Sequence, residues 1–180
     1  MRIVVVYESM FGATRQVASA IAEGLTPFGS VTIANVNDPN ARSAAEVGNV
    51  LIAGGPTHAH GMSRPASRAE AQKWANDPAK DFTLEPSAPG TGVREWLDSL
   101  TDSPRFFAAF DTRVDIARIL SGAASGGIDY RLSQRGGHRL VPASSFLVAK
   151  DGRLEHGELR RATLWSAVLG DAIAALKVSH

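Results

Sequence analysis

Four short runs of this sequence are apolar or aromatic at every position, and this feature constrains the fold more than any other. Runs without polar alternation are typical of strands covered on both faces, as in a parallel sheet between two layers of helices. The runs are residues 3–7, 50–53, 106–110 and 146–149. Residues 31–36 interleave Thr32 and Asn35 with apolar residues, which predicts a fifth strand at an edge of the sheet.

Segments with the spacing of amphipathic helices separate these strands. Apolar residues recur at i, i+3, i+4 and i+7 over residues 17–25 and 93–100, and again from about residue 158 onward. Two weaker helices are expected over residues 42–47 and 123–135. Strands that alternate with helices predict a three-layer, doubly wound α/β fold, in which a five-stranded parallel sheet has the order 2-1-3-4-5. A chain of 180 residues has the usual size of one domain, so we expect a single domain over residues 1–180.

The alternation of strands and helices does not account for residues 63–90, and we expect them to form an insertion after the third strand. They include a predicted helix over residues 67–74, and a proline-rich stretch follows it. An excursion of this length is usually functional or mobile, and this one leaves the carboxyl end of a strand, where such sheets bind ligands. Trp74, inside the insertion, has two interpretations: it shields a ligand, or it packs the insertion onto the domain.

Composition excludes several classes of protein. The absence of cysteine excludes a disulfide scaffold, a Cys-ligated metal site and a thiol nucleophile. Lys and Arg number 19 against 18 Asp and Glu, without a long run of one sign, which predicts no nucleic-acid partner. No segment approaches the ~18 apolar residues of a membrane span, and the first apolar run is shorter than the roughly 7–15 residues of a signal-peptide core. We therefore expect a cytoplasmic protein without a membrane partner.

The turn between the first strand and the first helix, residues 7–15, is the most informative loop. Ser9, Gly12 and Thr14 there would direct backbone N–H groups and two hydroxyls to one point, where the positive end of the helix dipole adds to their effect. This pattern predicts a seat for a small anion such as a monophosphate. The alternative is helix capping, in which Ser9 or Thr14 only satisfies free amides.

Two further loops are expected to meet this one. Residues 54–63 contain two glycines and a proline at the end of the third strand, which predicts a shaped loop, and residues 111–114 follow the fourth strand. Strands 1, 3 and 4 are neighbours in a 2-1-3-4-5 sheet, so the three loops converge at its topological switch point.

These residues resemble the flavodoxin-like family over essentially the whole chain. The resemblance rests on the second loop, Gly-Gly-Pro-Thr-His-x-His-Gly-Met-Ser, and on the third, Phe-Asp-Thr-Arg-Val. The first loop matches the flavodoxin pattern at Ser9, Gly12 and Thr14, but Phe11 stands where the family has a central Thr. An aromatic residue before the glycine is similar to the FMN-dependent quinone reductases of the superfamily.

The resemblance implies that the cofactor is FMN, with its phosphate on residues 9–14 and its ring between residues 56–62 and 112–114. Flavodoxins commonly place an aromatic side chain against the ring, whereas Ala59 is small and the third loop has no Tyr or Trp. The implied cofactor-binding residues are Ser9, Met10, Phe11, Gly12, Ala13, Thr14, Pro56, Thr57, His58, Ala59, His60, Gly61, Thr112, Arg113 and Val114.

Charge suggests which redox chemistry the site would support. A cation beside the flavin favours its reduced, anionic form, and Arg113, assisted by His58 or His60, is expected to supply it. The net charge of +1 fits a reductase better than an acidic electron shuttle. The hypothesis is an FMN-dependent oxidoreductase that takes electrons from NAD(P)H or a reductase and passes two of them to a quinone-like acceptor. Quinone reductases of this fold complete their site across a subunit interface, which implies a homo-oligomer.

Other interpretations of the same residues remain. His58 and His60 could be two metal ligands, but no clear third and fourth ligand accompany them, so we predict no metal. No serine stands in a G-x-S-x-G motif, which argues against a hydrolase. The main alternative is a flavodoxin-like fold that has lost the flavin and serves as an interaction or regulatory module, as Phe11 and Ala59 would allow.

Overall fold

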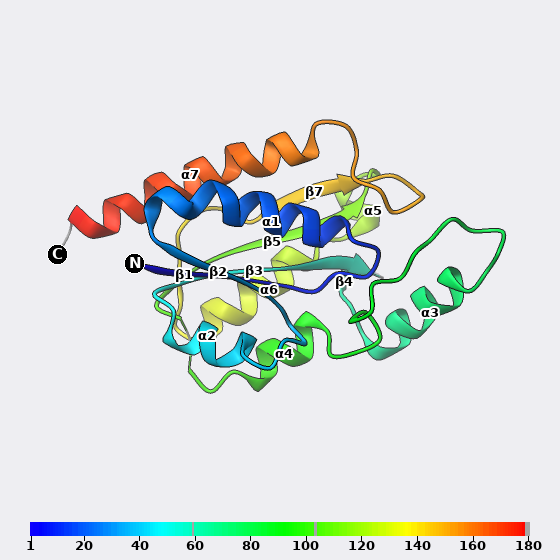
Figure 1. Cartoon of the computed structure of the whole chain (residues 1–180), viewed down its shortest axis with the longest axis horizontal. Coiled ribbons are helices and arrows are strands. Elements are labelled where there is room, and N and C mark those ends of the chain that lie inside the picture. The colour runs from blue at the N-terminus through cyan, green and yellow to red at the C-terminus, as the bar shows by residue number, and fades with distance from the viewer. Residues whose placement is uncertain (59, 103, 179–180) are drawn as a thin grey trace.

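The computed structural model describes residues 1–58, 60–102 and 104–178, and its centre is a parallel β-sheet (Figure 1). The sheet has the order β2-β1-β3-β5, with β6 and β7 both paired to the outer side of β5. This arrangement confirms the predicted 2-1-3-4-5 order, since β5 is the predicted fourth strand. The parallel strands are β1 (Arg2–Tyr7), β2 (Ser30–Asn35), β3 (Val50–His58), β5 (Phe106–Val114), β6 (His138–Arg139) and β7 (Ser144–Val148).

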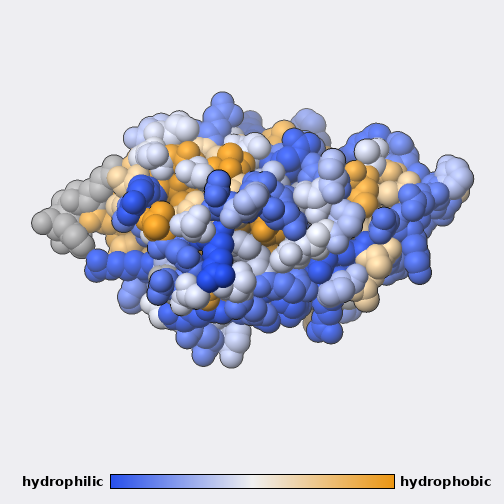
Figure 2. All heavy atoms as spheres, turned by 60° about the horizontal axis from the view of Figure 1, so that its bottom comes forward, coloured by the Kyte–Doolittle hydropathy of each residue, from blue (hydrophilic) through white to orange (hydrophobic). Residues whose placement is uncertain are grey.

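Helices cover both faces of the sheet (Figure 1). One apolar core lies under α1 (Ala13–Leu25) and α7 (Glu158–Val178). The other lies under α2 (Ala41–Val47), α4 (Val93–Ser99) and α6 (Ala124–Gln134). Figure 2 shows hydrophilic side chains over much of the face that carries α2 and α4, with apolar atoms in groups between them. Coverage on both faces explains why the strand sequences are apolar at successive positions. The short helices are η1 (Thr26–Phe28) and α5 (Arg118–Ser121).

The last strand of the predicted 2-1-3-4-5 order, expected at residues 146–149, consists of two pieces in the structure, β6 and β7. β6 pairs with the start of β5 through Phe106 and His138, and β7 pairs with its end, from Phe110 opposite Ser144 onward. The sequence predicted a single strand over residues 146–149. Pro142 stands between the two pieces and has no N–H to donate, so the ladder is interrupted there.

β3 extends further than predicted, and this corrects the expected start of the second loop. Gly54, Gly55 and Pro56 are strand residues, paired with Phe110, Asp111 and Thr112 of β5. On the opposite side, β1 pairs with β3 only as far as Gly54. Beyond that point β3 has one free edge, where a proline costs no ladder hydrogen bond. The chain then turns back into β4 (Gly61–Met62), which pairs antiparallel with the end of β3.

Gly54 is required by the packing of β5, which yields a stability prediction. A Cβ at this position would lie 2.2 Å from Cζ of Phe110, which is fully buried. We expect Gly54→Ala to lower the free energy of unfolding by about 1–3 kcal/mol, because overpacking a filled core forces its side chains apart. Urea denaturation measures the change.

A second glycine serves as the matched control. Gly126 lies in α6, and a Cβ there would have no atom within 4 Å. Gly126→Ala should raise stability by about 0.5–1 kcal/mol through helix propensity. Equal effects of the two substitutions would contradict the packing argument.

The segment expected as an insertion lies beyond the carboxyl ends of the strands (Figure 1). It starts with α3 (Pro65–Ala75), which begins two residues earlier than predicted because Pro65 fits the first helical turn. Ala71 and Ala88 of this segment pack against Met10 of the first loop. None of the helices in the described ranges is long and apolar enough to span a membrane.

Candidate functional site

A cavity of about 260 Å³ opens at the carboxyl edge of the sheet. The ends of β1, β3, β5 and β7 and the segment after α3 form its walls. The chain leaves β1 toward one face of the sheet and β3 toward the other, so the cavity lies at a topological switch point, where open α/β sheets bind ligands. Its lining residues are Met10, Phe11, Ala13, Thr14, Pro56, Thr57, His58, Trp74, Phe82, Thr112, Arg113, Val114, Val148, Ala149, Lys150 and Gly152.

The structure brings residues of all three predicted loops together around this cavity. The predicted residues in its lining are Met10, Phe11, Ala13, Thr14, Pro56, Thr57, His58, Thr112, Arg113 and Val114. Ser9, Gly12, His60 and Gly61 are not among the lining residues, and Ala59 falls outside the residues that the structure describes. The convergence predicted from strand order is therefore present, although four of the predicted residues that the structure describes do not line the cavity.

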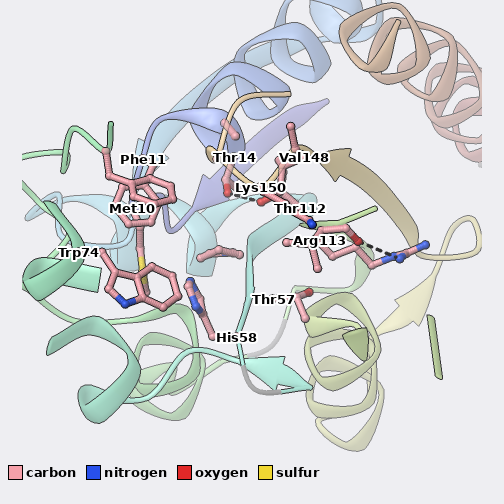
Figure 3. A pocket seen from close by; sticks show the side chains of 16 residues that line it. Met10, Phe11, Thr14, Thr57, His58, Trp74, Thr112, Arg113, Val148 and Lys150 are labelled. Atoms are coloured by element: carbon pink, nitrogen blue, oxygen red, sulfur yellow. Dashed lines mark hydrogen bonds between the residues drawn. The ribbon is translucent and has the colours of Figure 1, made fainter. Parts of the chain in front are cut away.

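The first loop is held by its own side chains, and its helix is left uncapped. Ser9 Oγ accepts a hydrogen bond from the Gly12 N–H at 3.2 Å. Gly12 precedes α1 with a φ of +93°, a conformation that favours glycine, and no side chain caps the helix. Thr14 Oγ1 lies 2.7 Å from Thr112 Oγ1, so the first turn of α1 contacts the end of β5 (Figure 3). Helix capping by Ser9, the alternative to an anion site, is therefore limited to the N–H of Gly12. The N–H groups in the first turn of α1 have no partner within the helix.

The end of β3, which was predicted as part of the second loop, contributes a hydroxyl and a half-buried imidazole. Thr57 Oγ1 accepts a hydrogen bond of 2.9 Å from the N–H of Ala124, the first residue of α6. Burial lowers the pKa of His58, so its imidazole is neutral at pH 7. His60 is exposed, with a φ of +71°. Within the described residues no three His, Cys, Asp or Glu side chains gather as metal ligands would.

Residues 111–114, predicted as the third loop, are the last residues of β5, because their pairing with β7 extends the strand. Arg113 there is not the expected free cation. Its Nη1 donates to the carbonyls of Val114 at 3.3 Å and Ile116 at 2.8 Å, and to Ser121 Oγ at 3.2 Å. These bonds direct the end of the side chain to the chain that follows β5. Its Nε is buried without a partner, although the residue lines the cavity. Arg113 therefore holds the chain that follows β5, and its buried Nε has no hydrogen-bond partner.

Aromatic side chains reach the cavity from the segment after β3. The ring of Phe82 lies 4.6 Å from that of Phe11 and 5.9 Å from that of Trp74, measured between centroids. In Figure 3, Phe11, Trp74 and His58 lie together on one side of the cavity, whereas Thr14, Thr112 and Lys150 lie on the other. Sequence reasoning left Trp74 between two roles and missed Phe82. The signal was available: two aromatic residues stand in an excursion that starts at the carboxyl end of a strand.

The loop after β7 completes the wall and was also missed. Val148, Ala149, Lys150 and Gly152 line the cavity. Gly152 has a φ of +82°, and a Cβ there would lie 3.0 Å from Phe82 Cε1, so the loop packs tightly against the aromatic wall. The strand order could have indicated this loop, because β7 ends at the same edge as the other three strands.

A buried carboxylate connects the first loop to the base of the insertion. Glu8 is 2% exposed and accepts hydrogen bonds from Ser63 Oγ at 2.6 Å and from the Val93 N–H at 2.8 Å. Arg68 Nη1 donates to the same Ser63 Oγ and to Glu95 Oε2. Burial raises the pKa of Glu8, and the two hydrogen bonds oppose this shift in part. Sequence reasoning did not single out Glu8, since a carboxylate next to a loop looks solvated.

Comparisons with known proteins identify the fold. No protein-family model matches the sequence, and neither does any curated protein. The structure is similar to a flavodoxin from the domain Archaea, with a TM-score of 0.64 and 15% identity over 97% of this chain and 99% of the other. It is similar to a WrbA-like flavodoxin protein from Agrobacterium tumefaciens, with a TM-score of 0.62 and 20% identity over 97% and 98% of the two chains.

A larger protein contains the same architecture. Rubredoxin oxygen:oxidoreductase from Desulfovibrio gigas matches with a TM-score of 0.61 and 16% identity, over 97% of this chain and 36% of that one. Matches that span nearly all of this chain agree with its strand order and with helices on both faces of its sheet. The chain therefore has the flavodoxin-like fold.

Proposed function

We propose that the protein binds FMN in the cavity at the carboxyl edge of the sheet and serves as an electron-transfer oxidoreductase. The observation that carries the proposal is the division of this cavity into an aromatic side and a hydroxyl side (Figure 3). Flavodoxin and WrbA-like proteins share the fold, which supports a redox role. A planar ring suits the first side, and a phosphate ester suits the second.

The residues present fit the cofactor. The first-turn N–H groups of α1 and the hydroxyls of Thr14 and Thr112 would hold the phosphate. Phe11, Trp74 and Phe82 offer aromatic faces for the ring. They would take the place of the aromatic residues that the second and third loops lack. The unpartnered Nε of Arg113 is a buried donor that a ligand could satisfy.

FMN supplies the redox chemistry when it is bound, and the chain supplies position, charge and exclusion of water. The aromatic side chains of Phe11, Trp74 and Phe82 would shield the ring from solvent. Because His58 is neutral, the cations of the lining are Lys150 and Arg113. We propose the two-electron reduction of a quinone-like acceptor. A hydride from NAD(P)H brings two electrons and one proton, solvent brings the second proton, and the acceptor leaves as a hydroquinone.

A titration of purified protein with FMN tests the proposal. We expect the fluorescence of FMN to be quenched with a 1:1 end point, because a ring stacked on aromatic side chains loses its emission. The FMN-loaded protein should then oxidise NADPH or NADH only when a quinone is present, as measured by absorbance of the nicotinamide.

Two outcomes would contradict parts of this assignment. Protein that ignores FMN at millimolar concentration would favour the flavin-free interaction module. Protein that binds FMN but reduces no quinone with either nicotinamide would favour a carrier that receives its electrons from a reductase.

A further inference from the structure

Lys150 is the one cationic side chain in the described lining that has neither a hydrogen bond nor an ion pair with a described residue. The lining contains three residues that can carry a positive charge: His58, Arg113 and Lys150. Burial keeps His58 neutral at pH 7, and the guanidinium of Arg113 is bound to two carbonyls and to a serine hydroxyl. No hydrogen bond or ion pair joins Lys150 to another described residue.

The acidic residues around the cavity do not compensate this charge. The described lining contains no Asp or Glu. Next to it in the chain, Asp81 Oδ2 lies 3.0 Å from Arg153 Nη2, and Asp151 Oδ2 lies 3.8 Å from Arg153 Nη1. Glu85, beside the first loop, is paired with Arg15. Arg15 balances Glu85, and Arg153 balances one of the two aspartates, so one negative charge is left over beside the cavity. The lining itself carries two cations, Arg113 and Lys150, and the cavity therefore keeps a net positive charge.

Backbone hydrogen bonds fix the turn from which the exposed side chain of Lys150 extends. The turn that carries it is closed by hydrogen bonds from the Ala149 N–H to the Arg153 carbonyl at 2.8 Å and from the Gly152 N–H to the Ala149 carbonyl at 3.0 Å. Gly152 packs against Phe82, and Arg153 pairs with Asp81, so the turn is also attached to the insertion. In Figure 3, Lys150 lies on the side of Thr14 and Thr112, opposite Trp74.

We propose that Lys150 determines the specificity of the cavity for a phosphorylated ligand, by pairing with the phosphate held at the start of α1. The inference rests on the proposed function for the identity of the ligand as FMN. It goes beyond that function because it predicts discrimination between FMN and riboflavin, which share the ring and differ in the phosphate. A charge-assisted hydrogen bond to one phosphate oxygen is sufficient for about a tenfold preference.

The experiment compares four proteins: wild type, Lys150→Met, Lys150→Arg and Lys80→Met. Lys80 is the matched control, since its Nζ lies 4.7 Å from the centre of the Trp74 ring but outside the lining. Fluorescence titrations give the dissociation constants for FMN and riboflavin. We expect Lys150→Met to weaken FMN about tenfold and to change riboflavin less than twofold. Lys150→Arg should restore most of the FMN affinity, and Lys80→Met should leave both constants near those of the wild type.

Two measurements give independent readouts. Raising the salt concentration should weaken FMN binding in the wild type more than in Lys150→Met, because the variant lacks the screened charge pair. Inorganic phosphate should raise the melting temperature of the wild type and of Lys80→Met more than that of Lys150→Met.

The outcomes separate this inference from the proposed function. Equal weakening of FMN and riboflavin in Lys150→Met, or no weakening of either, would overturn the role of Lys150 while leaving flavin binding intact. If the wild type binds neither flavin, the proposed function fails, and the phosphate measurement decides the inference alone. Equal stabilisation by phosphate in wild type and Lys150→Met would then overturn it.

Discussion

Thr14→Glu is expected to abolish FMN binding while the protein stays folded. Thr14 is in the first turn of α1, lines the cavity and lies with its hydroxyl 2.7 Å from that of Thr112. A carboxylate there would meet the phosphate at close range, and like charges at such a contact cost several kcal/mol. Affinity for FMN should therefore fall about 100-fold or more. Fluorescence titration measures the loss.

A second substitution separates charge from the loss of the hydroxyl. Thr14→Val has nearly the same shape and removes only the oxygen, so we expect a loss of affinity of about tenfold or less. Circular dichroism should be unchanged in both variants, because a glutamate in the first turn is compatible with the helix dipole. Unchanged FMN affinity in a folded Thr14→Glu protein would show that the phosphate lies elsewhere.

Replacing Glu8 should have the largest effect on stability. Its carboxylate is 2% exposed and accepts hydrogen bonds from Ser63 Oγ and from the Val93 N–H. Glu8→Ala would leave both donors buried without this acceptor and would open a cavity beside them. We expect a loss of about 2–4 kcal/mol in the free energy of unfolding, measured by urea denaturation at pH 7.

The same carboxylate predicts a pH dependence with a definite sign. Because burial raises the pKa of Glu8, the folded protein holds the proton to a higher pH than the unfolded chain does. The part of its contribution to stability that depends on the bound proton is therefore complete below about pH 4.5, the ordinary range of a glutamate, and declines as the pH rises through the raised pKa. Glu8→Gln keeps the size of the side chain and cannot ionise, so the difference in stability between wild type and Glu8→Gln should change over this window. A constant difference would contradict the assignment.

Glu46 affects stability in the opposite direction, but it does not obscure this measurement. Hydrogen bonds from Thr101 and Arg42 lower its pKa to about 2. Its contribution is present above about pH 4.5 and is lost as the pH falls toward 2. Since Glu46 is the same in wild type and Glu8→Gln, its effect cancels in the difference between them.

Sequence reasoning went furthest where the physical signal is local. The apolar runs identified the buried strands, and their alternation with helices identified a parallel sheet with helices on both faces. Where the prediction was wrong, a neighbouring strand decided the outcome. Gly54 and Pro56 look like loop residues, but Phe110 and Thr112 on β5 extend the ladder past them. A single sequence does not show which residues a strand will face across the sheet.

For the candidate site too, one part was predictable from the sequence and another depended on the tertiary structure. The sequence predicted that the loops after the first, third and fourth strands meet at one edge, since parallel strands end together and these three strands are neighbours in a 2-1-3-4-5 sheet. Only the tertiary structure decided which side chains face the cavity. Ser9 turns to the Gly12 N–H, Arg113 turns to carbonyls, and Phe82 and Lys150 enter from distant segments. The physical reason is that periodicity reports whether a residue is buried, whereas its partner depends on contacts between parts of the chain that are far apart in sequence.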